Sequence, residues 1–244
     1  MTANRFFIEH NQIFKNKAIL KGREHHHLSK VVRIKEKEKI WLFDEEGNSY
    51  LAQVEEIKKK ETHLSILKVE ERPTNNIKIV LAQALIKPSK MELVIQKATE
   101  LGIDEFIPVI TAWSRTIPEE KILTQKLVRW RRIALEAIKQ SGGFFVPKIA
   151  SPLHLSDLLR RGEKENYFLN EKGGEFLKEI IINSLTTIPE SVLLLIGPEG
   201  GWSEEEEKQM LTHGFKPVSL GKKILRTETA TISSLAIIIH FWKN

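Results

Sequence analysis

Two glycine-bearing loops in the C-terminal half of the chain carry the residue types that could perform chemistry. The first follows an apolar run at residues 193–196 and reads Gly-Pro-Glu-Gly-Gly at residues 197–201. The second follows residues 215–220 and leads into Arg226 and Glu228. Glycine lets the backbone approach a ligand closely, and ligands of open α/β sheets bind beyond the carboxyl ends of the strands. The two loops therefore predict a shared pocket. The alternatives are an ordinary strand–turn–helix connection and a simple Arg226–Glu228 ion pair.

The residues around the first loop indicate what kind of ligand this pocket would hold. The phosphate-binding patterns G-x-x-x-x-G-K-[ST] and G-x-G-x-x-G are both absent from the chain, which argues against NTPases and dinucleotide-dependent oxidoreductases. Four carboxylates at residues 204–207 disfavour phosphate further, so a cationic or neutral ligand is expected. The chain has no Cys, which excludes a thiol nucleophile, an iron–sulfur cluster and Cys-ligated zinc.

The elements that must position these loops alternate between apolar runs of strand length and longer amphipathic stretches. We expect strands at residues 77–83, 106–110, 167–169, 192–196 and 215–220. We expect helices at residues 90–101, 119–141, 175–185, 203–213 and 229–242, with Ser203 as an N-cap. This alternation predicts an α/β fold, with a parallel sheet that is covered by helices on both faces.

The chain before the polar segment 70–76 has a different pattern. Short apolar runs at 40–43, 50–54 and 62–69 predict a meander of strands, and residues 24–33 have helical spacing. The net charge of the whole chain is +6. The first 72 residues carry as much of it as the rest of the chain, so this smaller part is the denser in positive charge. Neither a membrane-spanning run nor a signal peptide is evident, so a cytoplasmic protein is expected.

Several motifs, taken in order along the chain, resemble the RsmE family of bacterial 16S rRNA (uracil-N3) methyltransferases of the SPOUT class. They lie at residues 5–7, 26–33, 90–102, 129–141, 196–203 and 220–230. The resemblance implies a small PUA-like β-barrel domain for RNA binding at residues 1–72. It also implies a SPOUT methyltransferase domain at residues 73–244, with a parallel sheet and a C-terminal trefoil knot. The implied partners are 16S rRNA or the small ribosomal subunit and a second copy of the chain in a homodimer, without a membrane or a metal.

The same resemblance implies that S-adenosyl-L-methionine is held by the knot loops. The residues expected to bind this cofactor are Leu169, Ile196, Gly197, Gly200, Gly201, Leu220, Gly221, Ile224 and Leu225. The expected reaction is methyl transfer to N3 of an unpaired or extruded uridine. Arg226 is the candidate for stabilising charge on a uracil carbonyl oxygen, and Glu228 is a candidate base or an orienter of Arg226.

Basic residues outside the pocket are candidates for contacts with RNA. We expect these contacts from Arg5, Lys30, Arg33 and Arg115. The stripe at residues 129–132 (Arg-Trp-Arg-Arg) is either a phosphate-binding face or a solvated face with Trp130 buried. Consecutive His at 25–27 cannot converge on one ion from a helix, so no metal site is expected there.

The chain departs from the family pattern at two positions, and its residues 86–89 are only loosely typical of that pattern. Gly143 and Lys223 stand where the family commonly has Arg, and Lys lacks the bidentate fork of Arg. These departures affect individual RNA contacts rather than the reaction. Two other functions are compatible with the sequence: a 2′-O-ribose methyltransferase of the same class, and a non-catalytic RNA-binding factor for ribosome assembly.

Overall fold

The structure is a computed structural model that describes residues 4–71, 77–114, 119–143 and 145–243. The chain forms two compact units. The N-terminal unit comprises Met1–Thr74 and Leu135–Val146, and the α/β unit comprises Asn75–Ala134 and Pro147–Asn244. The segment 70–76, which the sequence marks as a linker, lies largely outside the described residues.

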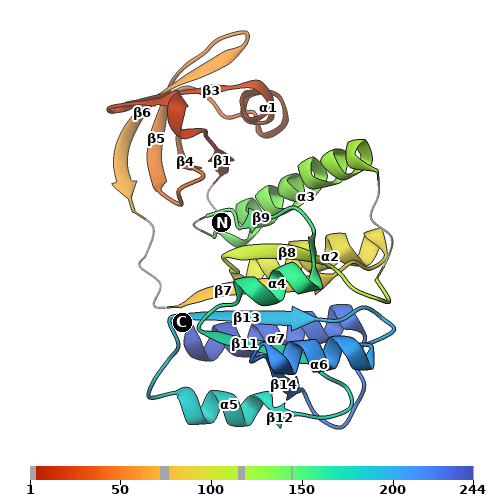
Figure 1. The fold of residues 1–244 in the computed structure, drawn as a ribbon. Coiled ribbons are helices and arrows are strands. Elements are labelled where there is room, and N and C mark those ends of the chain that lie inside the picture. Colours follow the sequence, from red (N-terminus) through yellow and green to blue (C-terminus); the bar gives the residue numbers. More distant parts are fainter. Residues whose placement is uncertain (1–3, 72–76, 115–118, 144, 244) are drawn as a thin grey trace. The chain divides into compact units, whose positions relative to one another are not determined.

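The N-terminal unit is a curled, mostly antiparallel sheet with the strand order β1-β4-β5-β6-β3-β2 (Figure 1). Its strands are β1 Arg5–Phe7, β2 Ile13–Phe14, β3 Lys17–Lys21, β4 Lys39–Phe43, β5 Ser49–Ile57 and β6 Glu61–Glu70. The predicted meander is confirmed as β4, β5 and β6. Register shifts between β5 and β6 mark β-bulges, which bend strands and help a sheet to curl around its core. Apolar side chains on the inner face, among them Leu20, Leu42 and Val54, are fully buried.

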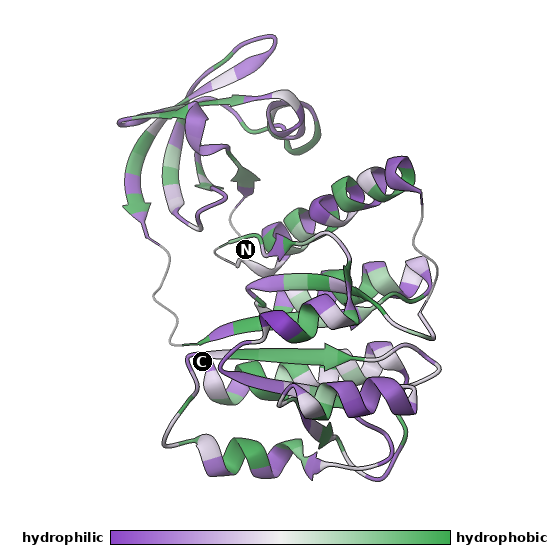
Figure 2. Ribbon diagram, viewed as in Figure 1, coloured by the Kyte–Doolittle hydropathy of each residue, from purple (hydrophilic) through white to green (hydrophobic). Residues whose placement is uncertain are grey.

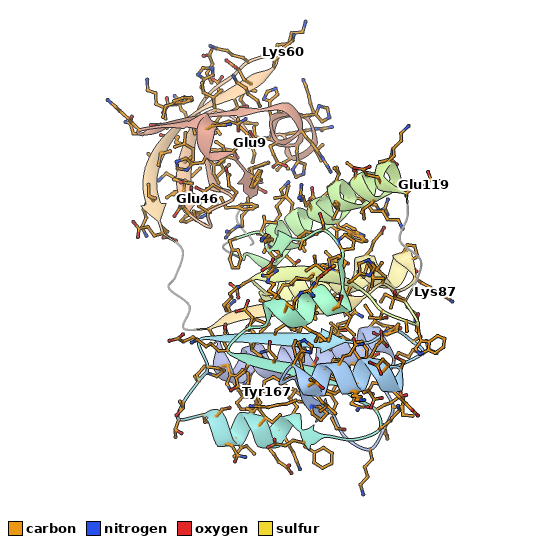
Figure 3. The ribbon with its side chains drawn as sticks, viewed as in Figure 1. Glu9, Glu46, Lys60, Lys87, Glu119 and Tyr167 are labelled. Carbon is orange, nitrogen blue, oxygen red and sulfur yellow. The ribbon has the colours of Figure 1, made fainter. Side chains whose placement is uncertain are left out.

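The helix predicted at residues 24–33 is confirmed as a continuous helical segment, which begins as an α-helix and continues as a π-helix. A short α-helix, α1 (Gly22–His26), runs into a π-type turn (His27–Val32), which ends at Arg33 in the left-handed conformation. Leu28 is buried in the core of the unit. Lysines gather at the tip of the hairpin between β5 and β6, where Lys60 extends outward (Figure 3).

The α/β unit is built on a sheet with the strand order β10-β8-β7-β13-β11-β14-β12, and β9 pairs with β8. Its strands are β7 Lys78–Ala84, β8 Glu105–Ile110, β9 Lys148–Ile149, β10 Leu153–His154, β11 Glu165–Leu169, β12 Glu175–Phe176, β13 Ser191–Ile196 and β14 Lys216–Ser219. All the pairings in this sheet are parallel. The central strand β13 is buried at every residue and apolar along almost its whole length (Figure 2), because helices cover both of its faces.

Two sets of helices cover this sheet, as the alternating pattern predicts. The helices are α2 Pro88–Leu101, α3 Glu120–Ser141, α4 Leu155–Arg161, α5 Leu177–Ser184, α6 Glu204–Thr212 and α7 Thr227–Trp242. Helix α7 packs against α2 and α5, and α4 packs against α6 on the other face (Figure 1). Among the described residues, no helix is both long enough and apolar enough to cross a membrane.

The short elements are where the sequence-based expectations differ from the structure. Helix α4 and strands β1, β2, β3, β9, β10 and β12 are not predicted, because pieces of two to seven residues show too little periodicity. The helix expected at 175–185 begins only at Leu177, since Glu175 and Phe176 form β12 at the edge of the sheet. The expected N-cap is confirmed: the Ser203 side chain accepts a hydrogen bond from the Glu206 backbone N–H in a capping box.

Candidate functional site

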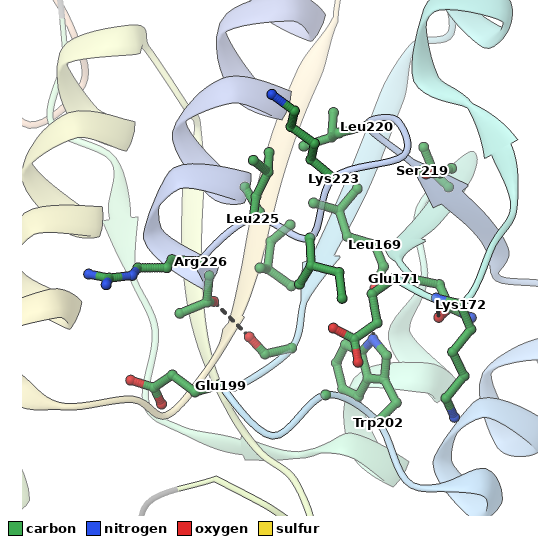
Figure 4. Close-up of a pocket in the computed structure, with 18 of the residues that line it drawn as sticks. Leu169, Glu171, Lys172, Glu199, Trp202, Ser219, Leu220, Lys223, Leu225 and Arg226 are labelled. Carbon is green, nitrogen blue, oxygen red and sulfur yellow. Dashed lines mark hydrogen bonds between the residues drawn. The ribbon is translucent and has the colours of Figure 1, made fainter.

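The two glycine-bearing loops meet at one edge of the α/β sheet. Strand β11 lies between β13 and β14 and is parallel to both, so the carboxyl ends of all three strands lie together. The loops that follow them surround a cavity of about 290 Å³ (Figure 4). All the residues expected to bind the cofactor line this cavity, with the exception of Gly200. The chain thus brings segments 169–172, 196–202 and 218–227 into one pocket.

Trp202 fastens the first loop to the end of β11. Its indole N–H donates to the Leu169 carbonyl oxygen at 2.8 Å, and its ring packs edge-on against Phe168. A Cβ on Gly197 would lie 3.1 Å from this ring, so any larger residue would push the ring or the loop out of place. Gly201 has a φ of +72°, a left-handed conformation that favours glycine. Gly197 is therefore required by the close Trp202 ring, and Gly201 by its left-handed backbone.

A buried polar network joins the two loops. The Thr227 hydroxyl donates to the Gly197 carbonyl oxygen at 2.7 Å, which is the dashed line in Figure 4. Gln83 on β7 is fully buried, and its amide donates to Thr227 and accepts from the Thr231 hydroxyl at 2.7 Å. Satisfied buried networks of this kind rigidify a site. Sequence reasoning missed Gln83 and Thr231, because a single Gln in an apolar strand is no recognisable motif.

The second loop presents apolar side chains to solvent beside the cavity. Ile224 is 76% exposed and Leu225 is 37% exposed, although side chains of this kind are usually buried. Gly221 has a φ of +134°, and its backbone N–H donates to the Ser219 hydroxyl. The exposed apolar side chains of Ile224 and Leu225 fit a ligand with a flat, weakly polar part. The cavity lining carries both signs of charge: the carboxylates of Glu171, Glu199 and Glu207, and the cations of Lys172, Lys222, Lys223 and Arg226. Glu171 and Glu199 are labelled in Figure 4.

Arg226 and Glu228 stand at the start of α7 but do not pair by contact. Arg226 is exposed and points away from Leu169 and Trp202 (Figure 4). Within the described ranges its side chain makes no hydrogen bond or ion pair, so its guanidinium is available to a substrate. The Glu228 carboxylate instead pairs with Lys90 of α2 at 3.1 Å. The simple Arg226–Glu228 contact that the sequence left open is therefore not formed.

Lys90 connects the two loops through their carboxylates. Its Nζ lies 3.3 Å from Glu199 in the first loop and 3.1 Å from Glu228 in α7. Burial alone raises the pKa of Glu228, but the backbone N–H of Glu228 and the Lys90 ammonium favour its charged form and hold the pKa below its usual value. Hydrogen bonds to Glu228 and Glu199 raise the pKa of Lys90. The sequence places Lys90 in a motif of the family but does not indicate that it pairs with Glu199 and Glu228.

The expected RNA-contacting residues differ in their surroundings. Lys30 and Arg33 are exposed on the helical segment of the N-terminal unit. Arg5 is only partly exposed: its Nη2 donates to the Gly143 carbonyl oxygen at 2.7 Å, and its guanidinium lies over the Phe43 ring. Arg115 lies outside the described residues.

The two departures from the family pattern have different settings. A Cβ on Gly143 would lie 2.8 Å from the Ile138 side chain, so a residue with a side chain would displace Ile138. Lys223 is exposed, and its side chain extends from the rim of the cavity (Figure 4).

The other candidate groups, namely the stripe at 129–132, the consecutive His and a cluster around Asp44, make contacts within the protein. Trp130 is buried and Arg129 pairs with Glu92, which supports the solvated-face interpretation of the stripe at 129–132. His25 is buried against the Thr62 hydroxyl, whereas its neighbour His26 is exposed, so consecutive His side chains diverge. Atoms of His10, Asp44 and Glu46 that could bind a metal lie near one another, but the Asp44 carboxylate already has hydrogen-bond partners within the protein. It accepts hydrogen bonds from Tyr50 and Asn48.

Comparison with known proteins relates both units to RNA methyltransferases. The RNA methyltransferase domain family matches residues 73–239, and the RNA methyltransferase PUA domain family matches residues 20–67. Ribosomal RNA small subunit methyltransferase E of Mesomycoplasma hyopneumoniae (strain 232) is 34% identical over 230 residues, which cover 93% of this chain and 95% of that protein. The protein of the same name from Bacillus subtilis (strain 168) is 32% identical over 225 residues, covering 90% of this chain and 88% of that protein.

Solved structures resemble the whole chain as well. A crystal structure of ribosomal RNA small subunit methyltransferase E from Neisseria gonorrhoeae, bound to S-adenosyl methionine, has a TM-score of 0.87 and 28% identity. A methyltransferase from Legionella pneumophila in complex with the cofactor SAM has a TM-score of 0.88 and 30% identity. In both cases 98% of each chain is covered.

Proposed function

This chain belongs to the RsmE family of ribosomal RNA small subunit methyltransferases, and from this membership we propose that it methylates N3 of a specific uridine in 16S rRNA. The methyl donor is S-adenosyl-L-methionine, as in the solved relatives that carry it. One observation supports this assignment above all. The glycine-bearing loops after β13 and β14 form a single cavity, and Arg226 stands at its edge with an uncommitted guanidinium.

The cavity fits the cofactor by shape and by its apolar surface. Gly197 leaves room beside the Trp202 ring that a Cβ would fill, and Ile224 and Leu225 offer apolar surface for an adenine. The lining also carries three carboxylates and four cationic side chains, so its charge is mixed. When bound, the cofactor supplies a methyl group on a cationic sulfur. The residues that we propose to hold it are Leu169, Ile196, Gly197, Gly201, Leu220, Gly221, Ile224 and Leu225, whereas Gly200 supports the loop from outside the cavity.

Arg226 is the proposed catalytic residue. Uracil N3 must lose its proton before its electron pair can attack a methyl group, and the negative charge then spreads onto the carbonyl oxygens. A guanidinium that points at such an oxygen stabilises this charge, and removal of one donor of this kind typically costs 10²–10³ in rate, or about 3–4 kcal/mol. Because the Arg226 side chain makes no hydrogen bond or ion pair within the described residues, no existing side-chain contact has to break before it meets the base.

Glu228 fits an orienting role better than a general base. A general base at neutral pH works best with a pKa near that pH, and the pKa of Glu228 is held below its usual value. Its carboxylate is also bonded to Lys90. We therefore assign Glu228, with Lys90, to the positioning of the first turn of α7 from which Arg226 projects. The proton of N3 leaves to solvent or to a group of the RNA complex.

The N-terminal unit is the proposed RNA-binding module. Lys30 and Arg33 are exposed there and free to meet phosphates, and Arg115 is a further proposed contact. We propose domain limits at residues 1–72 and 73–244, a trefoil knot formed by the loops after β13 and β14, a homodimer, and a location in the cytoplasm, where 16S rRNA is found. No metal has a role in this proposal.

The test is methyl transfer to purified small subunits and to free 16S rRNA, followed by mapping of the modified atom with mass spectrometry. We expect a base methylated at N3 of one uridine. A methyl group on a ribose 2′-oxygen would assign the chain to the other reaction of the class. Cofactor binding and RNA binding without any transfer would make it an assembly factor.

A further inference from the structure

Trp113 is unusual for its exposure. It follows β8 at the carboxyl edge of the α/β sheet and is 62% exposed. Trp130, Trp202 and Trp242 of the same chain are buried, as large aromatic side chains usually are. An exposed indole costs free energy in water, about 25 cal/mol for each Å² of apolar surface. A partner that covered the indole would therefore be favoured, and its surroundings indicate which kind of partner fits.

The backbone beneath Trp113 is fixed on both sides. The Ser114 N–H donates to the Thr111 carbonyl oxygen at 3.2 Å, and the Thr111 N–H donates to the Ser114 hydroxyl at 3.0 Å, which closes a tight turn. The Ala112 N–H donates to the Glu206 carboxylate at 2.7 Å. The same carboxylate caps α6. The indole is therefore presented from a rigid support, which lowers the entropy lost when a ligand binds to it.

Gly200 places this support against the cofactor loop. A Cβ on Gly200 would lie 3.2 Å from the Trp113 Cβ and 3.5 Å from its Cγ. Gly200 does not line the cavity, but its neighbours Glu199 and Gly201 do. The missing side chain of Gly200 thus makes room for Trp113, which stands beside the cavity rather than inside it.

The carboxylates near Trp113 indicate which part of an RNA, the phosphates or the bases, could cover the indole. Glu199 belongs to the adjoining loop, and four carboxylates occupy the first turn of α6, of which Glu206 bonds to the residue before Trp113. These groups repel phosphates but not the uncharged face of a base. Aromatic side chains bind unpaired bases by stacking, at about 1–3 kcal/mol for each base. A uridine whose N3 is to be methylated must lie outside its base pair, and its neighbours in the strand are exposed with it.

We propose that Trp113 is a stacking platform for an unpaired nucleobase of the rRNA segment that carries the target uridine, beside the cofactor cavity. The proposal rests on the RNA substrate proposed above and adds a binding subsite to it. It also assigns Gly200, the second glycine of the first loop, to this subsite instead of the cofactor.

The first experiment compares Trp113→Ala, Trp113→Phe and the control Ile182→Ala in the full-length protein. Ile182 is 64% exposed on α5, so its removal also deletes an exposed apolar side chain. We expect Trp113→Ala to weaken binding to the small subunit by roughly 5- to 150-fold, with cofactor affinity unchanged. Trp113→Phe should recover most of the loss, and Ile182→Ala should bind like the wild type. Equal binding by Trp113→Ala and the wild type would overturn the proposal.

The second experiment uses acrylamide quenching of tryptophan fluorescence. Free wild-type protein should show a strongly quenched component that Trp113→Phe lacks, and bound RNA should protect that component. A Trp113 that stays accessible in the RNA complex would overturn the proposal. So would a shift of Trp113→Ala from dimer to monomer in light scattering without loss of RNA affinity, because the partner would then be a second copy. If the wild type binds subunits but transfers no methyl group, the proposed function fails, while these binding measurements still decide the role of Trp113.

Discussion

Arginines in the two units of the molecule are used in opposite ways. The Arg226 side chain in the α/β unit is exposed and makes no hydrogen bond or ion pair within the described ranges. Arg5 in the N-terminal unit donates to the Gly143 carbonyl oxygen and lies over the Phe43 ring. Burial lowers the pKa of Arg5, against the influence of Glu70, which raises it. The first arginine is available for a substrate, and the second contributes to the structure of its own unit.

The same contrast holds for the carboxylates. Asp44 in the N-terminal unit is fully buried and accepts hydrogen bonds from Tyr50 and Asn48. Glu199 and Glu228 at the cavity share one lysine, Lys90. A fully satisfied network stabilises a fold, whereas groups with spare hydrogen-bonding capacity at the ends of buried strands can serve a ligand. Substitutions in the two units should therefore separate into effects on catalysis and effects on stability.

The largest effect is expected for Arg226→Ala. We expect kcat for methyl transfer to fall by about 10²–10³, because one charge-stabilising donor is lost from the transition state. Cofactor affinity, measured by calorimetry, should stay within about threefold of the wild type. Arg226→Lys should recover part of the rate, since it keeps the charge and loses the fork. Methyl transfer by Arg226→Ala at the wild-type rate would show that Arg226 has no catalytic role, and the contrast with Arg5 would then be wrong.

Asp44→Asn should lower stability without lowering the activity of the folded protein. We expect the free energy of unfolding to fall by about 2–3 kcal/mol at pH 7, since hydrogen bonds to a buried charge are lost. Burial raises the pKa of Asp44, but the hydrogen bonds from Tyr50, Asn48 and His10 outweigh it, so the folded-state pKa lies below the unfolded one. Its contribution is therefore present above about pH 4 and disappears as the pH falls through the folded-state pKa.

Urea unfolding at several pH values measures both expectations for Asp44. The wild type should lose stability on acidification more steeply than Asp44→Asn does. Parallel pH curves for the two proteins would show that the Asp44 network does not hold the N-terminal unit together.

Lys90→Met tests the ion pairs that join Glu199 of the first loop to Glu228 of α7. We expect kcat/KM to fall by about tenfold, because Glu199 and Glu228 lose their common partner in a partly exposed site. Without the ammonium, the pKa of Glu228 rises, so the acidic limb of the pH–rate profile should move to higher pH. Lys90→Arg should restore most of the rate and the original profile. A slower enzyme with an unshifted profile would indicate that Lys90 has only a structural role.

The smallest effect is expected for Lys30→Ala and Arg33→Ala in the N-terminal unit. Each should weaken binding to the small subunit by about two- to fivefold and reduce the salt dependence of binding by about one phosphate contact. Lys60→Ala at the tip of the β5–β6 hairpin is the matched control, since it removes an equal charge from the same unit. If Lys60→Ala weakens binding equally, the N-terminal unit contributes diffuse charge rather than a defined surface.

Periodicity along the chain is sufficient to predict most of this fold. The apolar run that became β13 and the capped start of α6 both depend on neighbouring residues, so they can be recognised locally. The edge strands and α4 are too short for such recognition. The resemblance to a family supplied what periodicity could not, namely the cofactor and the reaction.

The sequence by itself determined where the two glycine-bearing loops begin and that they would share a pocket. Only the tertiary structure decided which distant side chains connect them. Gln83 meets Thr231 across 148 residues of chain, and Lys90 reaches both Glu199 and Glu228. It also decided that Gly200 makes room for Trp113 and that Arg5 is bonded to Gly143. The physical reason is that local propensities depend on neighbours in sequence, whereas these contacts exist only once the parallel strands and their helices have packed.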